Sequence, residues 1–244
     1  MSAAPEPVSV FAQCLIDGIY PDVAHEVVKI FRHLDLEVDC PKEQTCCGQP
    51  AFNTGYAEEA RTAARHFIEI FESSKAIVCP SGSCVDMIRH HYPALFADDA
   101  KWSERALGVS RKTYEFTEYL VDVIGVTDLG ASYPGRATYH DSCHLFRRLK
   151  VAAQPRQLLK NVEGLEFVEM KESTRCCGFG GTFSVKYPDL SEAILSDKVD
   201  QIIASKVDTV TGCDMSCLMN IQGMLSRRQS GIKVKHIAEI LGRI

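Results

Sequence analysis

Residues 46–51 read Cys-Cys-Gly-Gln-Pro-Ala, and residues 176–181 read Cys-Cys-Gly-Phe-Gly-Gly. Each pair belongs to a series of the same shape: Cys14, Cys46, Cys47 and Cys84 in the first half, and Cys143, Cys176, Cys177 and Cys217 in the second. The step from lone cysteine to pair is 32 and 33 residues, and the step from pair to closing cysteine is 37 and 40. Chance rarely places eight thiols in two matching series. The sequence therefore predicts a duplicated unit with a thiol site in each half.

The size of the chain gives these cysteines no role as disulfide staples. A chain of 244 residues can bury most of its apolar surface, so it needs no cross-links to stabilise a thin core. Eleven cysteines also leave one thiol over in any full pairing. We find no export signal and no apolar run long enough for a membrane span. These features predict a cytoplasmic protein, in whose reducing compartment clustered cysteines hold metal more often than they form disulfides.

The net charge of -5 argues against nucleic acid as a partner. One tract without acids, residues 142–162, is locally basic. Its cations are Arg147, Arg148, Lys150, Arg156 and Lys160. They form either a solvated face or a docking patch for an acidic redox partner.

Strands and helices alternate in both halves, which predicts an α/β fold of two pseudo-repeated parallel-sheet lobes, residues 1–125 and 126–244. Strands are expected at 8–12, 36–39 and 76–79, and at 137–140, 165–168 and 209–211. The apolar faces of helices carry Val23, Val27, Ile30 and Leu34; Ala60, Ala64, Phe67 and Phe71; Leu195, Val199 and Ile202; and Leu218, Ile221 and Leu225. Residues 92–135 are expected to be a linker with a short helix at 114–123.

This topology predicts where the cysteines meet. The lone and closing cysteines follow predicted strands, and ligands of parallel α/β sheets gather outside the strand carboxyl ends. A helix N-terminus would favour the thiolate form of each closing cysteine. Gly48 and Gly178 allow backbone N–H groups to approach the site. The hydroxyls of Ser83 and Ser216 are further expected donors.

Adjacent cysteines favour a multinuclear centre. On a regular strand their side chains would point to opposite faces, so binding one group with both requires an irregular turn. The C-x-x-C knuckles typical of zinc sites are absent. An iron–sulfur core offers several iron atoms to neighbouring sulfurs. Iron–sulfur binding is the first hypothesis, and zinc or no metal are the alternatives.

The motifs resemble those of the cysteine-rich CCG-domain family, which includes the heterodisulfide reductase B subunit. They are most similar to the lactate utilization A group of that family. The segments that carry the resemblance are 46–51, 80–84, 140–143, 176–184 and 236–239. The resemblance implies an iron–sulfur cofactor, [4Fe-4S] in type and one or two per chain, with the eight cysteines as ligands. It also implies a role in oxidising L-lactate to pyruvate with lactate utilization proteins B and C.

The sequence departs from the heterodisulfide reductase pattern at the end of each series. That pattern closes with C-x-x-C, whereas here Cys79 lies five residues before Cys84, and Cys213 lies four before Cys217. Cys79 and Cys213 are either extra ligands or buried strand-end thiols. Cys40 fits neither series and is expected to be structural. His140 and His144, on either side of Cys143, are open candidates as metal ligands, proton relays or hydrogen-bonding side chains. His236 is expected to open the last helix, where it either points at the sheet edge or is structural.

Three functions remain in view. The first is an electron-transfer subunit of an iron–sulfur oxidoreductase acting on lactate, in which no side chain is assigned as catalytic. The second is a thiol–disulfide oxidoreductase like heterodisulfide reductase. The third is a non-catalytic scaffold that binds partner subunits.

Overall fold

The computed structural model describes residues 7–244. Contacts divide the chain into two units, unit 1 (Met1–Tyr119) and unit 2 (Leu120–Ile244). The predicted division into lobes 1–125 and 126–244 stays a prediction. The expected lack of an export signal also stays a prediction, because residues 1–6 lie outside the described part of the chain.

Unit 1 is built on a parallel sheet of order β2-β1-β3-β4. Its strands are β1 (Val8–Val10), β2 (Val38–Asp39), β3 (Ala76–Cys79) and β4 (Thr113–Glu115). Its helices are α1 (Cys14–Ile19), α2 (Pro21–His33), α3 (Gln49–Asn53), α4 (Ala57–Phe71), α5 (Gly82–Asp86), η1 (Met87–His91, a π-helix), α6 (Tyr92–Leu95), α7 (Ala100–Arg111) and α8 (Phe116–Glu118).

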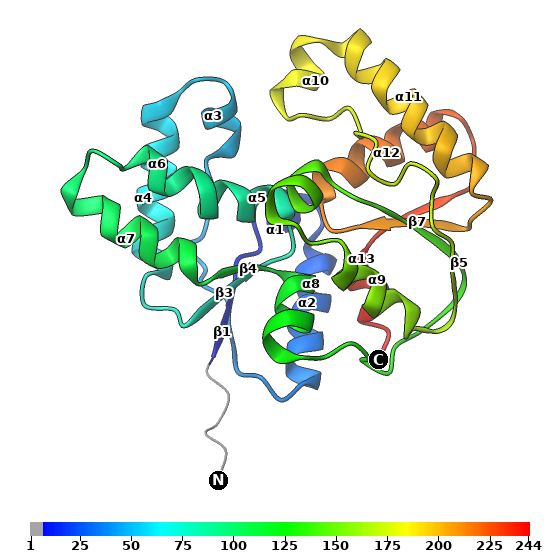
Figure 1. The fold of residues 1–244 in the computed structure, drawn as a ribbon, viewed down its shortest axis with the longest axis horizontal. Coiled ribbons are helices and arrows are strands. Elements are labelled where there is room, and N and C mark those ends of the chain that lie inside the picture. Colours follow the sequence, from blue (N-terminus) through cyan, green and yellow to red (C-terminus); the bar gives the residue numbers. More distant parts are fainter. Residues whose placement is uncertain (1–6) are drawn as a thin grey trace. The chain divides into compact units, whose positions relative to one another are not determined.

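Aromatic residues form the core of unit 1 on both faces of the sheet. Figure 1 shows α2 and α8 on one face and α4 and α7 on the other. Phe31 of α2 packs against Phe116 with ring centroids 5.8 Å apart. On the other face Phe11, directly after β1, packs edge-on against Phe67 of α4 at 5.0 Å. The end of β1 is therefore fixed by a buried aromatic ring.

Unit 2 repeats this plan in a parallel sheet of order β6-β5-β7-β8. Its strands are β5 (Ser132–His140), β6 (Glu163–Phe167), β7 (Thr209–Gly212) and β8 (Lys233–His236). Its helices are η2 (Tyr119–Ile124, a π-helix that starts at the last residue of unit 1), η3 (His144–Leu149, also π), α9 (Ala153–Lys160), α10 (Thr182–Lys186), α11 (Pro188–Ala204), α12 (Met215–Arg227) and α13 (Ile237–Leu241). In Figure 1, α11 and α12 cover one face of the sheet, and α9 and α13 the other.

Both sheets reverse their strand order between the first and third strands of the unit. The chain moves from β1 outward to β2, then crosses back to β3 on the other side, and β5, β6 and β7 do the same. A crevice at the carboxyl ends of the strands is expected at such a switch point. This position lies beside the loops that carry the lone and closing cysteines.

The predicted fold class, two repeated parallel α/β lobes with cysteines near the strand ends, is confirmed. The strand expected at 76–79 coincides with β3, and the other expected strands overlap β1, β2, β5, β6 and β7. The expected helical faces fall on α2, α4, α11 and α12.

The linker predicted at 92–135 is wrong, because this segment contains α7 and the fourth strand, β4, which pairs with β3. The sequence of β4 does not show the apolar pattern of a buried strand, because its buried residue Glu115 is polar. The Glu115 carboxylate accepts hydrogen bonds from the backbone of Thr117 and Glu118 and caps α8. Strand β8, which precedes the capping box at His236 and Glu239, was missed for the same reason.

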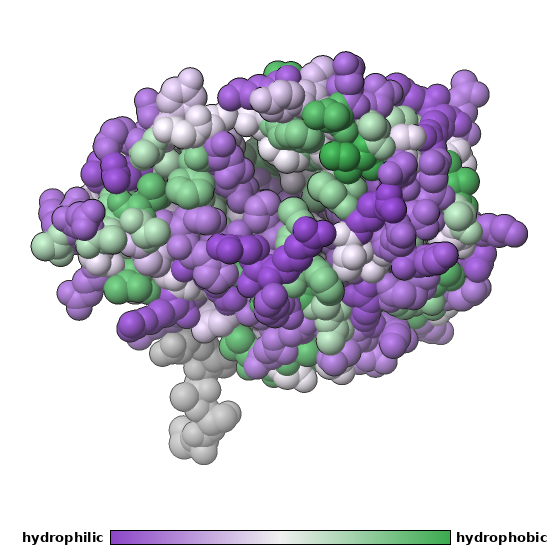
Figure 2. All heavy atoms as spheres, turned by 45° about the horizontal axis from the view of Figure 1, so that its top comes forward, coloured by the Kyte–Doolittle hydropathy of each residue, from purple (hydrophilic) through white to green (hydrophobic). Residues whose placement is uncertain are grey.

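The surface gives no sign of a continuous apolar band on the face in Figure 2, where hydrophobic side chains form separate groups among hydrophilic ones. Among the described residues, large apolar side chains are exposed on α10 and at the start of α11, notably Val185, Tyr187 and Leu190. Within residues 7–244, none of the helices has the length and hydrophobicity needed to cross a bilayer.

Candidate metal centre

The first site lies at the carboxyl ends of β1 and β3. Cys14 begins α1, Cys84 lies in the first turn of α5, and the pair Cys46–Cys47 lies in the loop between β2 and α3. The Sγ atoms of Cys47 and Cys84 are 3.4 Å apart. Further thiol hydrogen bonds join Cys14 to Cys46 and Cys46 to Cys47. The four predicted ligands of unit 1 therefore form one connected group.

Hydrogen bonding among these thiols favours two thiolates. Cys46 accepts hydrogen bonds from the thiols of Cys14 and Cys47, which lowers its pKa to about 3. Cys84 accepts from Cys47 and from Cys79, and its pKa lies well below the ordinary value despite burial. The same bonds raise the pKa of the donors Cys14 and Cys47. Because the thiolate is the form that binds metal, the site is electrostatically prepared for a cation.

The pair loop of unit 1 is fixed through its backbone. Gly48 has φ of 83°, and its N–H donates to Cys46 Sγ at 3.4 Å. A Cβ here would lie 3.2 Å from the carbonyl oxygen of Ala60 in α4. Tyr92, fully buried in α6, donates its hydroxyl to the carbonyl oxygen of Cys47 at 2.8 Å. The irregular turn predicted for adjacent cysteines is thus present, and Tyr92 is a positioning residue that the sequence pattern did not reveal.

The second site occupies the corresponding place in unit 2. Cys143 caps η3 after β5, Cys217 lies in the first turn of α12 after β7, and the pair Cys176–Cys177 lies in the loop after β6. Hydrogen bonds join Cys176 to Cys177 and Cys177 to Cys217. Cys143 lies close enough to Cys217 for its negative charge to raise the pKa of Cys217. The Sγ atom of Cys143 lies 3.6 Å from Nδ1 of His144.

The thiols of the second site are held more firmly in their protonated form. Donation to Cys177, followed by burial, raises the pKa of Cys176. The hydrogen bond from Cys176 lowers the pKa of Cys177, but donation to Cys217 and burial outweigh it, so the pKa is well above the ordinary value. Cys217 accepts from Cys177, yet burial and nearby negative charges leave its pKa raised.

The second pair loop has its own anchors. Gly178 has φ of 78°, and its N–H donates to Cys176 Sγ at 3.3 Å. A Cβ at this position would lie only 2.4 Å from the carbonyl oxygen of Ser191. Asn220 of α12 donates to the carbonyl oxygen of Cys177 at 2.9 Å. Both units therefore hold the second cysteine of the pair by its carbonyl, but with different side chains.

His140 is the side chain at the second site that the structure most clearly singles out. It ends β5, is 1 % exposed, and neither of its ring nitrogens has a hydrogen-bond partner. A ring nitrogen and the Sγ atoms of Cys177 and Cys217 all lie within 4.8 Å of one another. Burial, with the nearby charge of Lys198, holds the pKa of His140 well below its usual range. The hydrogen-bonding role weighed for His140 is not found.

The other candidate residues have different surroundings from one another. Cys79 is buried at the end of β3 and bonds to Cys84, whereas Cys213 accepts a hydrogen bond from Tyr139 Oη at 3.0 Å. Cys40 is exposed in a groove beside α2, where Gln44 donates to its Sγ at 3.4 Å. His236 Nδ1 accepts from the backbone N–H of Ala238 and so caps α13.

One expectation about polar neighbours was wrong: the Ser216 hydroxyl donates to Asp214 instead of a sulfur. At Cys84, a hydrogen bond comes from the hydroxyl of Ser81, the N-cap of α5. Arg156 is not part of an open basic face, because its guanidinium is paired with the buried carboxylate of Asp141 at 2.7 and 2.9 Å.

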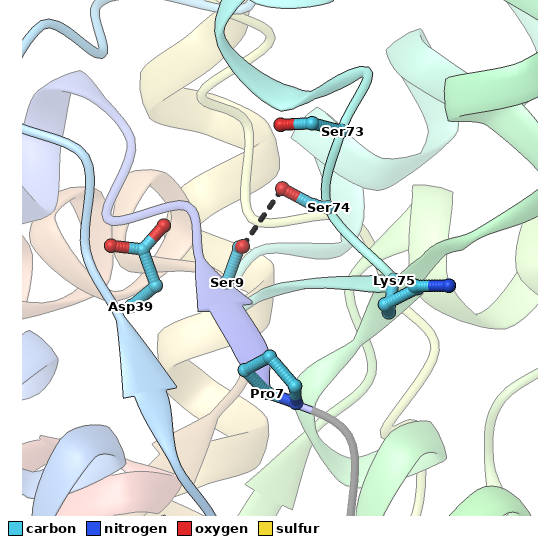
Figure 3. A pocket seen from close by; sticks show the side chains of 6 residues that line it. All are labelled: Pro7, Ser9, Asp39, Ser73, Ser74 and Lys75. Atoms are coloured by element: carbon cyan, nitrogen blue, oxygen red, sulfur yellow. Dashed lines mark hydrogen bonds between the residues drawn. The ribbon is translucent and has the colours of Figure 1, made fainter.

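A hollow of about 290 Å³ in unit 1, shown in Figure 3, lies where β3 begins instead of where it ends. Its lining includes Ser9 and Ser74, whose hydroxyls are 2.8 Å apart, and the charged side chains of Asp39 and Lys75. No cysteine or histidine lines it. This hollow is separate from the candidate metal centre.

Comparison with known proteins agrees with the duplicated architecture. The family model described as CCG, cysteine-rich domain, matches twice, at residues 8–89 and 137–222. The chain belongs to the cysteine-rich CCG family. The two matches contain both cysteine series and end before β4 and β8, the strands that the sequence patterns missed.

Relatives in this CCG family resemble the chain over nearly its whole length. A protein of an Exiguobacterium species named lactate utilization protein A is 51% identical, with 96% of each chain covered. The lactate utilization protein A 1 of Bacillus mycoides is 49% identical, with 96% of each covered. The lactate utilization protein A of Macrococcus caseolyticus is 50% identical over 96% of this chain and 95% of its own. The chain is therefore a member of the lactate utilization A group of the family.

Proposed function

We propose that this protein is an iron–sulfur subunit that transfers electrons in the oxidation of L-lactate to pyruvate. The observation that carries the proposal is the connected group of four thiols at the strand ends of unit 1, with its counterpart in unit 2. The name shared by the relatives supports lactate as the substrate of the system.

The donor set fits clusters of the [4Fe-4S] type, one in each unit. Thiolates are the usual ligands of such clusters, and hydrogen bonds to sulfur tune their potentials. The glycine N–H groups already donate to Cys46 and Cys176. When bound, an iron–sulfur cluster supplies one-electron transfer. Two such sites suit a substrate whose oxidation releases two electrons and two protons.

At each site some of the cysteines are buried and others are exposed to solvent. Cys47 and Cys84, like Cys177 and Cys217, are buried and would exclude water from one side of each bound group. Cys14 and Cys176 are exposed, so the other side of each site reaches the surface of its own unit. Electrons would enter or leave through these exposed sides. We propose lactate utilization proteins B and C as the partners that meet them.

Anaerobic reconstitution tests the cofactor. Purified full-length protein is incubated with iron and sulfide, and both are then quantified per chain alongside electron paramagnetic resonance spectra of the oxidised and reduced states. We expect stoichiometric iron and sulfide and a cluster signal. A folded protein that takes up neither would refute the proposal.

Genetic complementation tests the role in lactate oxidation. In a host that depends on this protein for growth on lactate, Cys47→Ser and Cys177→Ser should each abolish growth. Cys40→Ser is the matched control, because Cys40 lies in an exposed groove outside both sites and its loss should leave growth intact. Growth of both site variants would favour a scaffold. Disulfide reduction by the purified chain, independent of lactate, would favour the thiol–disulfide reaction.

A further inference from the structure

The two sites differ at positions that the repeat makes equivalent. Phe11, directly after β1, and His140, the last residue of β5, each stand three residues before the lone cysteine of their series. Cys79 and Gly212 each stand five residues before the closing cysteine, at the end of β3 and β7. Unit 1 therefore has an aromatic ring and a thiol where unit 2 has an imidazole and no side chain.

These substitutions compensate one another in space. His140 and Gly212 are neighbours in the register of β5 and β7. A Cβ at position 212 would lie 3.1 Å from the carbonyl oxygen of His140 and 3.7 Å from its Cβ. A thiol there, as Cys79 has in unit 1, would crowd the histidine. Glycine in a strand often marks such a close approach.

The helices that pack over these strand ends, α4 in unit 1 and α11 in unit 2, also differ at equivalent positions. The carbonyl oxygens of Ala60 in α4 and Ser191 in α11 are each what a Cβ on the pair-loop glycine would meet, so we treat the two residues as equivalent. Seven residues further along, Phe67 packs against Phe11 in unit 1. The residue at the same step in unit 2 is Lys198, whose charge acts on His140. An apolar pair has been replaced by a polar one beneath the second site.

The His140 ring has a donor and an acceptor in a dry environment and uses neither. Leaving such a buried group unpaired is unfavourable, because its lost hydration is not compensated by a hydrogen bond. Imidazole nitrogen is a common metal ligand, and two buried thiols lie within 4.8 Å of it. A bound metal would satisfy the ring nitrogen that carries the lone pair.

We propose that His140 ligates the metal group of the second site through a ring nitrogen, which makes this site mixed nitrogen–sulfur while the first is all sulfur. This inference rests on the proposed function only in that the group contains iron. Where the imidazole takes the place of one of the four thiolates of unit 2, it removes one negative charge from the bound cluster and raises its potential. The second site is therefore the stronger electron acceptor of the two.

Pulsed electron paramagnetic resonance tests the ligand directly. The full chain carrying Cys46→Ser and Cys47→Ser, which confines iron to unit 2, is labelled with ¹⁵N-histidine, reconstituted and reduced. We expect a strongly coupled ¹⁵N nucleus, lost in His140→Phe and kept in His144→Phe. Absence of coupling in the iron-loaded protein, or its loss only in His144→Phe, would overturn the proposal. The measurement on the labelled protein with His140 intact does not depend on how the variants fold.

Cobalt separates this inference from the proposed function. Co²⁺ alone is titrated into the same apo protein, and the d–d and sulfur-to-cobalt absorption bands are followed. His140→Phe should weaken binding at least ~10-fold, since even outer-shell changes at metal sites cost this much. If iron and sulfide are not taken up but cobalt binding depends on His140, the iron–sulfur function fails and the ligand assignment stands. Equal cobalt affinity in both proteins would overturn the assignment.

Discussion

The two units share the same sheet topology and cysteine loops, but different side chains lie at the strand ends next to their thiols. Both have the same strand order, an adjacent cysteine pair, a glycine with positive φ and a side chain that holds the carbonyl of the second cysteine. Beneath the thiols, however, unit 1 places Phe11 and Cys79, and unit 2 places His140 and Gly212. Duplication has kept what shapes the loop, whereas the residues at the strand ends differ in chemistry between the two units.

The pKa values of the closing thiols also differ between the two units. In unit 1, Cys84 accepts from Cys79 as well as Cys47, and its pKa is lowered. In unit 2, Cys217 lacks this second thiol donor, and burial with negative neighbours raises its pKa. Metal binding must displace protons from thiols. The first site is therefore closer to its metal-binding form than the second.

The largest expected effect comes from removing a closing cysteine from one unit at a time. Cys84→Ser and Cys217→Ser should each lose the iron of their own unit, about half the total, because each closing thiol contacts the buried cysteine of its pair. Iron and sulfide analysis after reconstitution measures the loss. Complete loss of iron from either variant would contradict two independent sites.

The pair-loop glycines should differ in their tolerance of a side chain. Both have positive φ, but a Cβ would meet Ser191 O at 2.4 Å in unit 2 and Ala60 O at 3.2 Å in unit 1. Left-handed strain costs 1–2 kcal/mol, and overpacking adds to it. We expect Gly178→Ala to destabilise the apo protein by ~4 kcal/mol and Gly48→Ala by ~2 kcal/mol in denaturant unfolding. A larger loss for Gly48→Ala would contradict the packing difference.

The sequence predicted most of the fold because the inner strands are apolar and follow one another in a repeated order. Strands such as 76–79 carry an apolar run that only a buried strand needs. Strands β4 and β8 escaped because they lead into capping boxes whose residues are polar. Glu115 is fully buried, yet its burial depends on hydrogen bonds that hydropathy does not register.

The candidate ligands were predictable from spacing, whereas their supports were not. Closely matching steps between cysteines identify both thiol series without reference to a fold. Tyr92 and Asn220 sit at different distances from their closing cysteines, so the repeat does not reveal that they do the same work. His140 was a candidate by its place close to Cys143, but only the folded structure shows that its ring is buried and unpaired.

Lys198 should make the stability of unit 2 depend on pH. Burial lowers the pKa of Lys198 to about 8 from 10.5, although Asp141 and the thiols of Cys176, Cys177 and Cys217 oppose this shift. Between these two pH values the unfolded chain binds the proton and the folded protein does not, so stability rises with pH, by roughly 3 kcal/mol.

Lys198→Met should remove this rise. The free energy of unfolding of the apo protein is measured from pH 7 to 10.5 for the variant and its parent, and their difference is compared, which cancels the titration of thiols common to both. Phe67→Met, at the equivalent position of unit 1, is the control and should leave the rise unchanged. A parent and a Lys198→Met variant with parallel pH curves would show that the lysine is not held neutral.

The smallest expected effect concerns the two carbonyl anchors. Tyr92→Phe removes the donor to Cys47 O in a fully buried setting, whereas Asn220→Leu removes the donor to Cys177 O where the side chain is only partly buried. An unsatisfied buried carbonyl costs 1–3 kcal/mol, and water can replace a lost donor only at the more open site. We expect losses of ~2 kcal/mol for Tyr92→Phe and ~1 kcal/mol for Asn220→Leu in denaturant unfolding. Hydrogen exchange at Gly48 and Gly178 reports each loop separately, and faster exchange at the wrong glycine would show that the anchors do not act locally.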